Sequence, residues 1–175
     1  SHAEAQQPTK VPRIGFLSST SDPSRPTPSL EGFRKGLRDL GYVEGKNILI
    51  EDRNAKGKLD RLPDLAAESV RLKVDVIVTG ITLAALAAKR LTTTIPIVIV
   101  GTGDPVGTGL VASLARPGGN VTGLSGLGPE LSGKRLELLK EAFPKVSRVA
   151  VFWNPTSPSN VISWSETQAA ARSLA

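Results

Sequence analysis

The chain of 175 residues contains no cysteine and a single histidine, His2. Without thiols it forms neither a disulfide framework nor a thiolate zinc site, and one histidine cannot build a histidine metal cluster. Nucleophilic catalysis also lacks its usual parts, because no cysteine is present and no histidine lies in the body of the chain to activate a hydroxyl. We therefore expect a protein that is not an enzyme and that uses no metal and no cofactor.

Aromatic residues make up only 4% of the chain, and no apolar run approaches the roughly 20 residues of a membrane span. The 22 basic residues exceed the 16 acidic residues by six, but they are scattered as singles and pairs. Such a surface is solvated, and we expect no nucleic-acid partner. The 17 glycines and 13 prolines indicate many turns and a core of small side chains, which is typical of a layered α/β protein.

Methionine is absent as well, so the first residue is not an initiator. Residues 1–10 show no apolar periodicity, and we interpret them as a flexible leader. Ser1-His2-Ala3 matches the small residues around a signal-peptidase site, which predicts a periplasmic or secreted protein whose signal peptide has been removed. A remnant of cloning explains the same residues equally well.

From residue 13 onward, short apolar runs alternate with helical patterns, which predicts a mostly parallel sheet covered on both faces. The expected strands are residues 14–17, 47–51, 74–79, 95–100, 121–124 and 148–153. The expected helices are residues 30–40, a second that Asp60 caps, a third over 83–90 that Thr82 caps, then 110–115, 129–143 and 161–174. Gly41 is expected to end the first helix in a left-handed conformation.

In a parallel sheet every strand ends at the same edge, so the segments after strands one, three and four should converge there. These segments, residues 18–21, 79–82 and 101–105, are rich in hydroxyls and glycine. The amino end of a helix that begins near Thr82 attracts a carboxylate, and Asp104 can meet an ammonium group, so together they suit a small zwitterion such as an amino acid. The alternative is that Thr82 only caps its helix and Asp104 only forms a turn.

The glycine pattern at residues 101, 103, 107 and 109 follows a strand, as in nucleotide-binding loops. It departs from the dinucleotide pattern because the third glycine comes one residue late, and Pro105 removes a backbone donor. A Rossmann-type nucleotide-binding enzyme domain is therefore a minor alternative to a binding protein.

Four segments carry a family resemblance. They are Arg13-Ile14-Gly15-Phe16-Leu17-Ser18, then Phe33-Arg34-Lys35-Gly36-Leu37 through Leu40-Gly41-Tyr42-Val43-Glu44-Gly45-Lys46-Asn47, then Gly103-Asp104-Pro105-Val106-Gly107, and Leu114-Ala115-Arg116-Pro117-Gly118-Gly119-Asn120-Val121-Thr122-Gly123. The chain resembles the solute-binding proteins of ABC importers, in particular the bacterial family that includes tryptophan and tyrosine transport components. The resemblance extends from residue 11 to residue 175. It implies a type I periplasmic binding protein, in which two similar Rossmann-like α/β lobes with parallel sheets close on a ligand by a hinge.

The resemblance implies that residues 11–127 form lobe one and the first crossover, and that residues 128–175 begin a second, similar lobe. The ligand-binding positions that it carries over are Ser18, Ser19, Thr79, Gly80, Thr82, Asp104 and, from the opposite lobe, Asn154. The implied function is to capture a small polar ligand, such as an amino acid, and to deliver it to an ABC permease and ATPase complex. A ligand-sensing domain of a regulatory protein is the alternative, because the same fold serves as a sensor.

Family members continue through the rest of lobe two, whereas this chain stops inside a helix of that lobe, so the resemblance implies a chain truncated in lobe two. The apolar residues Leu138, Leu139 and Trp164 then lack the sheet that they would cover. A homodimer formed through the incomplete second lobe is one expected consequence, and weakened ligand binding is another.

Overall fold

The computed structural model describes residues 10–20 and 27–174. Within these residues five strands form one parallel sheet in the order β2-β1-β3-β4-β5. The strands are β1 (Arg13–Ser18), β2 (Leu49–Asn54), β3 (Val76–Thr79), β4 (Ile97–Gly103) and β5 (Val121–Gly126). The predicted α/β class and the first five predicted strands are confirmed, with shifts of up to three residues at their ends.

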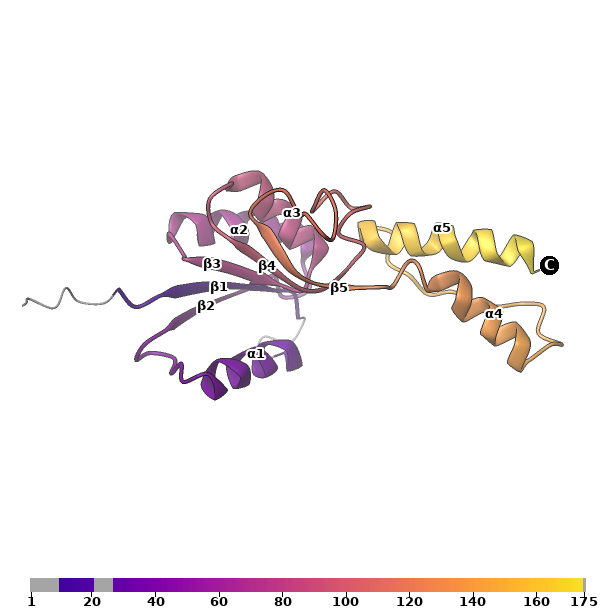
Figure 1. Ribbon diagram of the computed structural model, residues 1–175, viewed down its shortest axis with the longest axis horizontal. Coiled ribbons are helices and arrows are strands. Elements are labelled where there is room, and N and C mark those ends of the chain that lie inside the picture. Colours follow the sequence, from indigo (N-terminus) through magenta and orange to yellow (C-terminus); the bar gives the residue numbers. More distant parts are fainter. Residues whose placement is uncertain (1–9, 21–26, 175) are drawn as a thin grey trace, which may run out of the picture.

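Helices cover both faces of the sheet (Figure 1). Helix α1 (Pro28–Asp39) lies on one face, whereas α2 (Leu62–Arg71) and α3 (Thr82–Leu91) lie on the other. A short 3-10 turn (Leu59–Arg61) leads into α2. Because helices cover both faces, the central strands are apolar on both sides, as the continuous runs in the sequence predict.

The ends of α1 follow local rules. The Thr27 hydroxyl accepts a hydrogen bond from the Leu30 amide at 3.1 Å, which caps the amino end. Gly41 follows the carboxyl end with φ +84°, the left-handed conformation predicted for it. The inner side of α1 buries Leu30 over Phe16 and Val78 in the smaller of two core clusters.

The larger core cluster lies between the sheet and the helices α2 and α3. Its fully buried members include Leu17, Leu62, Ile77 and Ile97. Four alanines of α3 are buried there, and their small side chains let the helix lie close to the strands. This cluster holds the carboxyl ends of β1, β3 and β4 in place.

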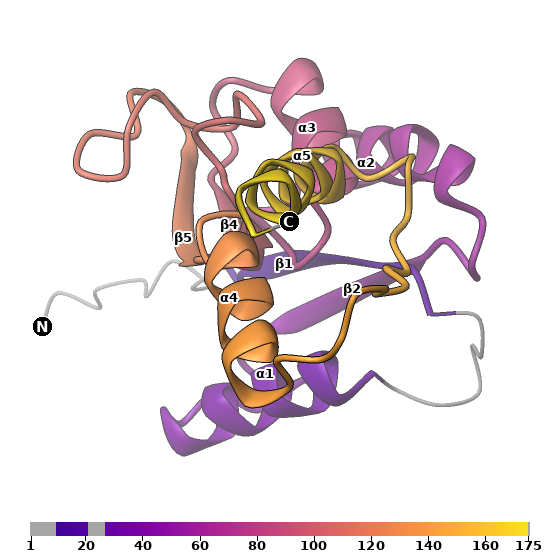
Figure 2. The ribbon, with the colours of Figure 1, turned by 90° about the vertical axis from the view of Figure 1, so that its right-hand side faces the viewer.

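After β5 the chain leaves the sheet at its carboxyl edge (Figure 1). Helices α4 (Ser132–Ala142) and α5 (Pro158–Ser173) lie against each other beyond that edge, as the view along the long axis also shows (Figure 2). Trp153 and Trp164 stack with ring centroids 5.6 Å apart. The predicted boundary between residues 127 and 128 falls just after β5, and the division into lobes stays a prediction.

The predicted sixth strand, residues 148–153, is wrong as a sheet element. The segment between α4 and α5 pairs with no strand among the described residues. Its apolar composition favours extended backbone, but a strand exists only where a second strand accepts and donates its hydrogen bonds.

The predicted helix over residues 110–115 is also wrong. Residues 105–109 form successive turns, and the side chains of Leu110 and Val111 are buried although they belong to no helix. The hydrogen bonds of this loop include those from the Val111 amide to the Pro105 carbonyl and from the Ala112 amide to the Pro117 carbonyl. Tertiary anchoring therefore outweighs the short helical pattern.

The two predicted side-chain caps are wrong too. Asp60 lies inside the 3-10 turn, and no side chain caps α2. Thr82 is the first residue of α3 itself, where its hydroxyl caps nothing. In both places the chain enters the helix one or two residues away from the position that a capping hydroxyl or carboxylate requires.

Candidate functional site

A cavity of about 470 Å³ lies at the carboxyl edge of the sheet. It is lined by the segments that follow β1 and β3, by the ends of β4 and β5 and by the beginning of α5. None of its lining residues is charged or aromatic; glycines, hydroxyl groups and amides dominate. Such a lining suits a small ligand held by hydrogen bonds.

Four of the predicted site residues line this cavity. Ser19 follows β1, Gly80 and Thr82 follow β3, and Asn154 comes from the segment before α5. A Cβ built at Gly80 would lie 3.1 Å from the Val100 carbonyl oxygen, so a side chain at this position would crowd β4. Residues far apart in the sequence thus meet at one edge of the sheet, as expected.

Ser18 and Thr79 lie at the same edge but do not line the cavity. The Ser18 hydroxyl donates to Asp52 Oδ1 at 3.2 Å and is buried beside β2. The Thr79 hydroxyl donates to the Leu17 carbonyl at 3.0 Å and accepts from the Ile81 amide at 3.1 Å. These hydroxyls fasten the ends of the strands to each other.

Asp104 also lies outside the cavity lining. Its Oδ1 accepts a hydrogen bond from the Gly107 amide at 2.7 Å, and its carbonyl accepts one from the Thr108 hydroxyl at 2.8 Å. Its φ of +36° belongs to a tight turn. The carboxylate therefore shapes the loop after β4, which is the alternative that the sequence left open.

The amino end of α3 borders the cavity through Ile81, Thr82 and Leu83. No side chain caps it, and the first amide bonded by the helix is that of Ala85, which donates to the Ile81 carbonyl at 3.0 Å. The amides of the first turn are thus left without an acceptor among the described residues. With the helix dipole they form a place for a negatively charged group.

Thr102 is the residue that sequence reasoning missed. It lines the cavity and is only 2% exposed, yet its Oγ1 has no hydrogen-bond partner in the described part of the chain. A buried hydroxyl without a partner costs free energy, so its presence beside a cavity points to a ligand. Only the hydroxyl-rich composition of residues 101–105 signalled it, because the irregularity between Val100 and Thr102 hides the alternation of side chains.

The beginning of α5 closes one side of the cavity. Gly103 packs so tightly there that an added Cβ would lie 3.2 Å from Ser159 Cβ. This approach brings Ser157, Ser159 and Asn160 into the lining. The sequence predicted only Asn154 from this region, since helical periodicity does not reveal which turn of α5 meets the sheet.

Residues 10–20 and 27–174 hold neither a metal-ion site nor a membrane-spanning helix. These residues contain no group of three or more histidine, aspartate or glutamate side chains placed to hold a metal ion. None of the helices there is both long and apolar enough to cross a bilayer.

The family model of the ABC transporter substrate binding protein matches residues 13–174. A tyrosine-binding protein of Clostridioides difficile is 40% identical over 154 residues, which are 87% of this chain and 44% of that protein. The crystal structure of a conserved domain protein from Vibrio cholerae is similar with a TM-score of 0.80 and 33% identity, over 94% of this chain and 54% of that one.

The structure of an ABC domain from Streptococcus pneumoniae in complex with L-Trp is similar with a TM-score of 0.79 and 27% identity. The match covers 93% of this chain and 54% of that one. The chain therefore spans about half the length of the relatives that it matches. The fold of its five-stranded sheet is that of the type I periplasmic binding proteins.

Proposed function

The chain belongs to the ABC transporter substrate-binding protein family, and from this premise we propose that it holds a small polar ligand in the cavity at the carboxyl edge of its sheet. The ligand is an amino acid in this proposal. Support comes from the relatives, because one is named as tyrosine-binding and another was solved with L-Trp.

The ligand's carboxylate is assigned to the amino end of α3. The free amides of the first turn, at Thr82, Leu83 and Ala84, donate hydrogen bonds, and the dipole of the ten-residue helix adds attraction. The uncharged lining supplies no competing anion. This lining also contains no carboxylate for the ammonium group, because Asp104 is committed to its turn.

The observation that carries the proposal is the unpartnered Oγ1 of Thr102. A hydroxyl buried without a partner destabilises the fold by about 1–3 kcal/mol unless something hydrogen-bonds to it. A ligand in the cavity that Thr102 lines would provide this partner. Thr102 therefore has the properties of a binding residue rather than of a core residue.

The transport role rests on the family. In this proposal the protein acts outside the cytoplasm, its signal peptide having been removed, closes on its ligand by a hinge and presents it to an ABC permease with its ATPase. The hinge is placed after β5, where Gly126 and Gly128 line the cavity and the chain passes toward α4. Asn154 and Ser157 then contribute to the cavity from beyond that connection.

The test is an NMR titration of the ¹⁵N-labelled chain with L-tryptophan and L-tyrosine, with tryptamine and tyramine as analogues that lack the carboxylate. We expect saturable shifts at the amides of Thr82, Leu83 and Ala84 with the amino acids and none with the amines. Equal shifts with both sets, or no shifts at these amides, would contradict the assignment.

Thr102→Val isolates the hydroxyl, since valine has nearly the same shape. We expect at least a tenfold loss of affinity, which corresponds to the loss of a hydrogen bond to a charged group, without loss of stability. Thr122→Val, at an exposed position of β5, is the matched control and should leave binding unchanged. If both variants bind like the parent chain, Thr102 is not a ligand contact.

A further inference from the structure

A second helix begins at the cavity beside the carboxyl edge of the sheet. Figure 1 shows the amino end of α5 directed toward that edge, and Ser157, Ser159 and Asn160 line the cavity. The amino end of α3 borders the same cavity through Thr82, and α3 and α5 are in contact. The positive ends of two helix dipoles therefore meet around one space.

The amino end of α5 has a free backbone donor. Ser157 precedes the helix but does not cap it through its side chain, and Pro158 has no amide hydrogen. The amides of Asn160 and Val161 both donate to the Ser157 carbonyl, at 3.0 and 3.1 Å. The Ser159 amide donates to no acceptor among the described residues, and Ser159 lines the cavity.

Asn154 adds a side-chain donor beside the same helix end. Its Oδ1 accepts hydrogen bonds from the Thr156 amide at 3.0 Å and from the Thr156 hydroxyl at 2.8 Å. These bonds fix the orientation of the side-chain amide, because only its oxygen can accept. The Nδ2 group has no acceptor in the described part of the chain, and Asn154 lines the cavity.

A buried hydroxyl marks this part of the cavity as a place for a ligand. Thr102 is 2% exposed and lines the cavity, and its Oγ1 has no hydrogen-bond partner among residues 10–20 and 27–174. The next residue, Gly103, approaches α5 so closely that an added Cβ would lie 3.2 Å from Ser159 Cβ. The unpaired hydroxyl and the free donors before and within α5 therefore belong to the same part of the cavity.

We infer that the amino end of α5 binds a second negatively charged group of the ligand, so that the preferred ligand is an acidic amino acid such as L-glutamate. This inference rests on the proposed function, in which the amino end of α3 holds the α-carboxylate. The side-chain carboxylate then accepts hydrogen bonds from the Ser159 amide and from Asn154 Nδ2, and the dipole of the 16-residue helix adds attraction. Aromatic amino acids have no charged group for this place and bind through the α-carboxylate alone.

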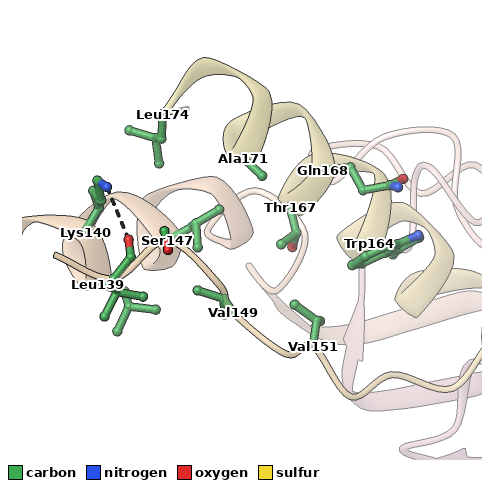
Figure 3. Close-up of a pocket in the computed structure, with 12 residues that line it drawn as sticks. Leu139, Lys140, Ser147, Val149, Val151, Trp164, Thr167, Gln168, Ala171 and Leu174 are labelled. Carbon is green, nitrogen blue, oxygen red and sulfur yellow. Dashed lines mark hydrogen bonds between the residues drawn. The ribbon is translucent and has the colours of Figure 1, made fainter. Parts of the chain in front are cut away.

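The groove between α4 and α5 has a different chemistry (Figure 3). Its volume is about 480 Å³, and its lining is mostly apolar, with Val149, Val151 and Trp164 among the side chains. Lys140, the charged side chain among its described lining residues, donates a hydrogen bond to the Val146 carbonyl at 3.2 Å. Burial of carboxylates against apolar side chains is costly, so a ligand with two carboxylates suits the cavity at the sheet edge and not this groove.

The experiment compares L-glutamate with L-glutamine, which has nearly the same shape but an uncharged side chain, by NMR titration of the ¹⁵N-labelled chain. We expect L-glutamate to bind about tenfold more tightly or better. Its shifts should include the Ser159 amide and the Asn154 side-chain amide as well as the amides of the first turn of α3.

Equal affinities, with shifts at α3 but none at Ser159, would overturn this inference and leave the proposed function standing. No shift at either helix with L-glutamate would overturn the inference as well. The titrations with L-tryptophan and L-tyrosine then decide the proposed function separately.

Asn154→Asp tests the α5 end through its charge. Aspartate keeps the acceptor for Thr156, so the turn is retained, but it replaces the Nδ2 donor with a negatively charged oxygen. We expect the affinity for L-glutamate to fall about tenfold or more, because two carboxylates then face each other. L-Glutamine should bind about as before, since its side-chain amide can donate to the new carboxylate.

Asn54→Asp is the matched control. Asn54 Oδ1 accepts a hydrogen bond from the Lys56 amide at 2.8 Å, which is the same kind of turn, but Asn54 does not line the cavity. This variant makes the same change of charge at the end of β2 and should keep the preference for L-glutamate. Equal losses in both variants would indicate a general effect of net charge. That result, or an unchanged preference in Asn154→Asp, would overturn the inference.

Discussion

Residues 13–126 and residues 127–174 both contain helices with several leucines or other apolar residues, but they bury these side chains very differently. Among the described residues every buried member of the two core clusters lies between positions 14 and 121. Leu62 of α2 is 1% exposed, whereas Leu138 of α4 is 52% exposed. The two leucines lie in helices of 10 and 11 residues, but only α2 has a sheet to cover. The difference shows that the apolar side chains of a helix stabilise the fold only where a second layer of structure packs against them.

The largest expected effect is a difference in unfolding between the two regions. Both tryptophans, Trp153 and Trp164, lie in residues 127–174, so their fluorescence reports that region alone. We expect the fluorescence transition in urea to precede the main far-UV circular dichroism transition, because the first region has a stability of several kcal/mol and the second little of its own.

The measurement is made on one sample at about 1 μM, with both probes followed through the same urea series. Coincident transitions by the two probes would show one cooperative unit and would break the comparison.

A pair of leucine substitutions probes the same contrast at single positions. Leu62→Ala removes a fully buried side chain from the larger core cluster and should lower the free energy of unfolding by about 2–5 kcal/mol. Leu138→Ala, in a helix of similar length, should change it by less than about 0.5 kcal/mol. Urea unfolding followed by circular dichroism measures both, and equal losses would refute the assignment of the core to the first region.

Glycine substitutions sharpen the comparison where the chain leaves the sheet. Gly123 has φ +137°, and a Cβ there would overlap the Ile99 carbonyl oxygen of β4. Gly123→Ala should therefore destabilise the first region by about 2 kcal/mol, through backbone strain and loosened pairing of β4 with β5. Gly128→Ala, only five positions further along, meets no atom within 4 Å and should be nearly neutral by thermal unfolding.

The smallest expected effect concerns the pH dependence of the first region. The hydrogen bond from Lys10 and, after it, that from the Arg13 amide hold the pKa of Asp75 below its usual range. Because the folded-state pKa is lowered, Asp75 contributes stability above its unfolded pKa of about 3.9, and this contribution is lost as pH falls through the folded value.

Asp75→Asn should thus lower stability by about 1 kcal/mol or less at pH 7, since the ion pair is exposed, and by less still in acid. Thermal unfolding at pH 7 and pH 3, with and without 1 M salt, measures the difference. A loss that persists at pH 3 and in high salt would assign the effect of Asp75 to something other than its charge.

The layered α/β fold of residues 13–126 was predictable because its signals are local. Apolar runs bounded by glycine and proline predicted the five paired strands, and the spacing of Leu30, Phe33 and Leu37 predicted α1. The convergence of the segments after β1, β3 and β4 followed from the handedness of parallel crossovers alone. Ser19, Gly80 and Thr82 therefore meet at one cavity as expected.

The chemistry of individual side chains at that edge was decided by the tertiary structure. Ser18, Thr79 and Asp104 come from the predicted segments, but nearby groups in the fold occupy their polar atoms. Thr102 comes from one of the same segments and is left without a partner. The residue type determines which groups a side chain can bind. Only its neighbours in the fold determine whether its polar atoms are free to bind a ligand.

Residues 147–153 show the same difference between what the sequence determines and what the tertiary structure decides. The amino-acid sequence alone determined that this segment is apolar and prefers an extended backbone, because composition and backbone preference belong to the segment itself. Whether it is a strand depends on a second strand, and its hydrogen bonds are made with residues distant along the chain or on another molecule. Periodicity is thus encoded locally, while pairing and the freedom of polar groups arise only when the chain is folded.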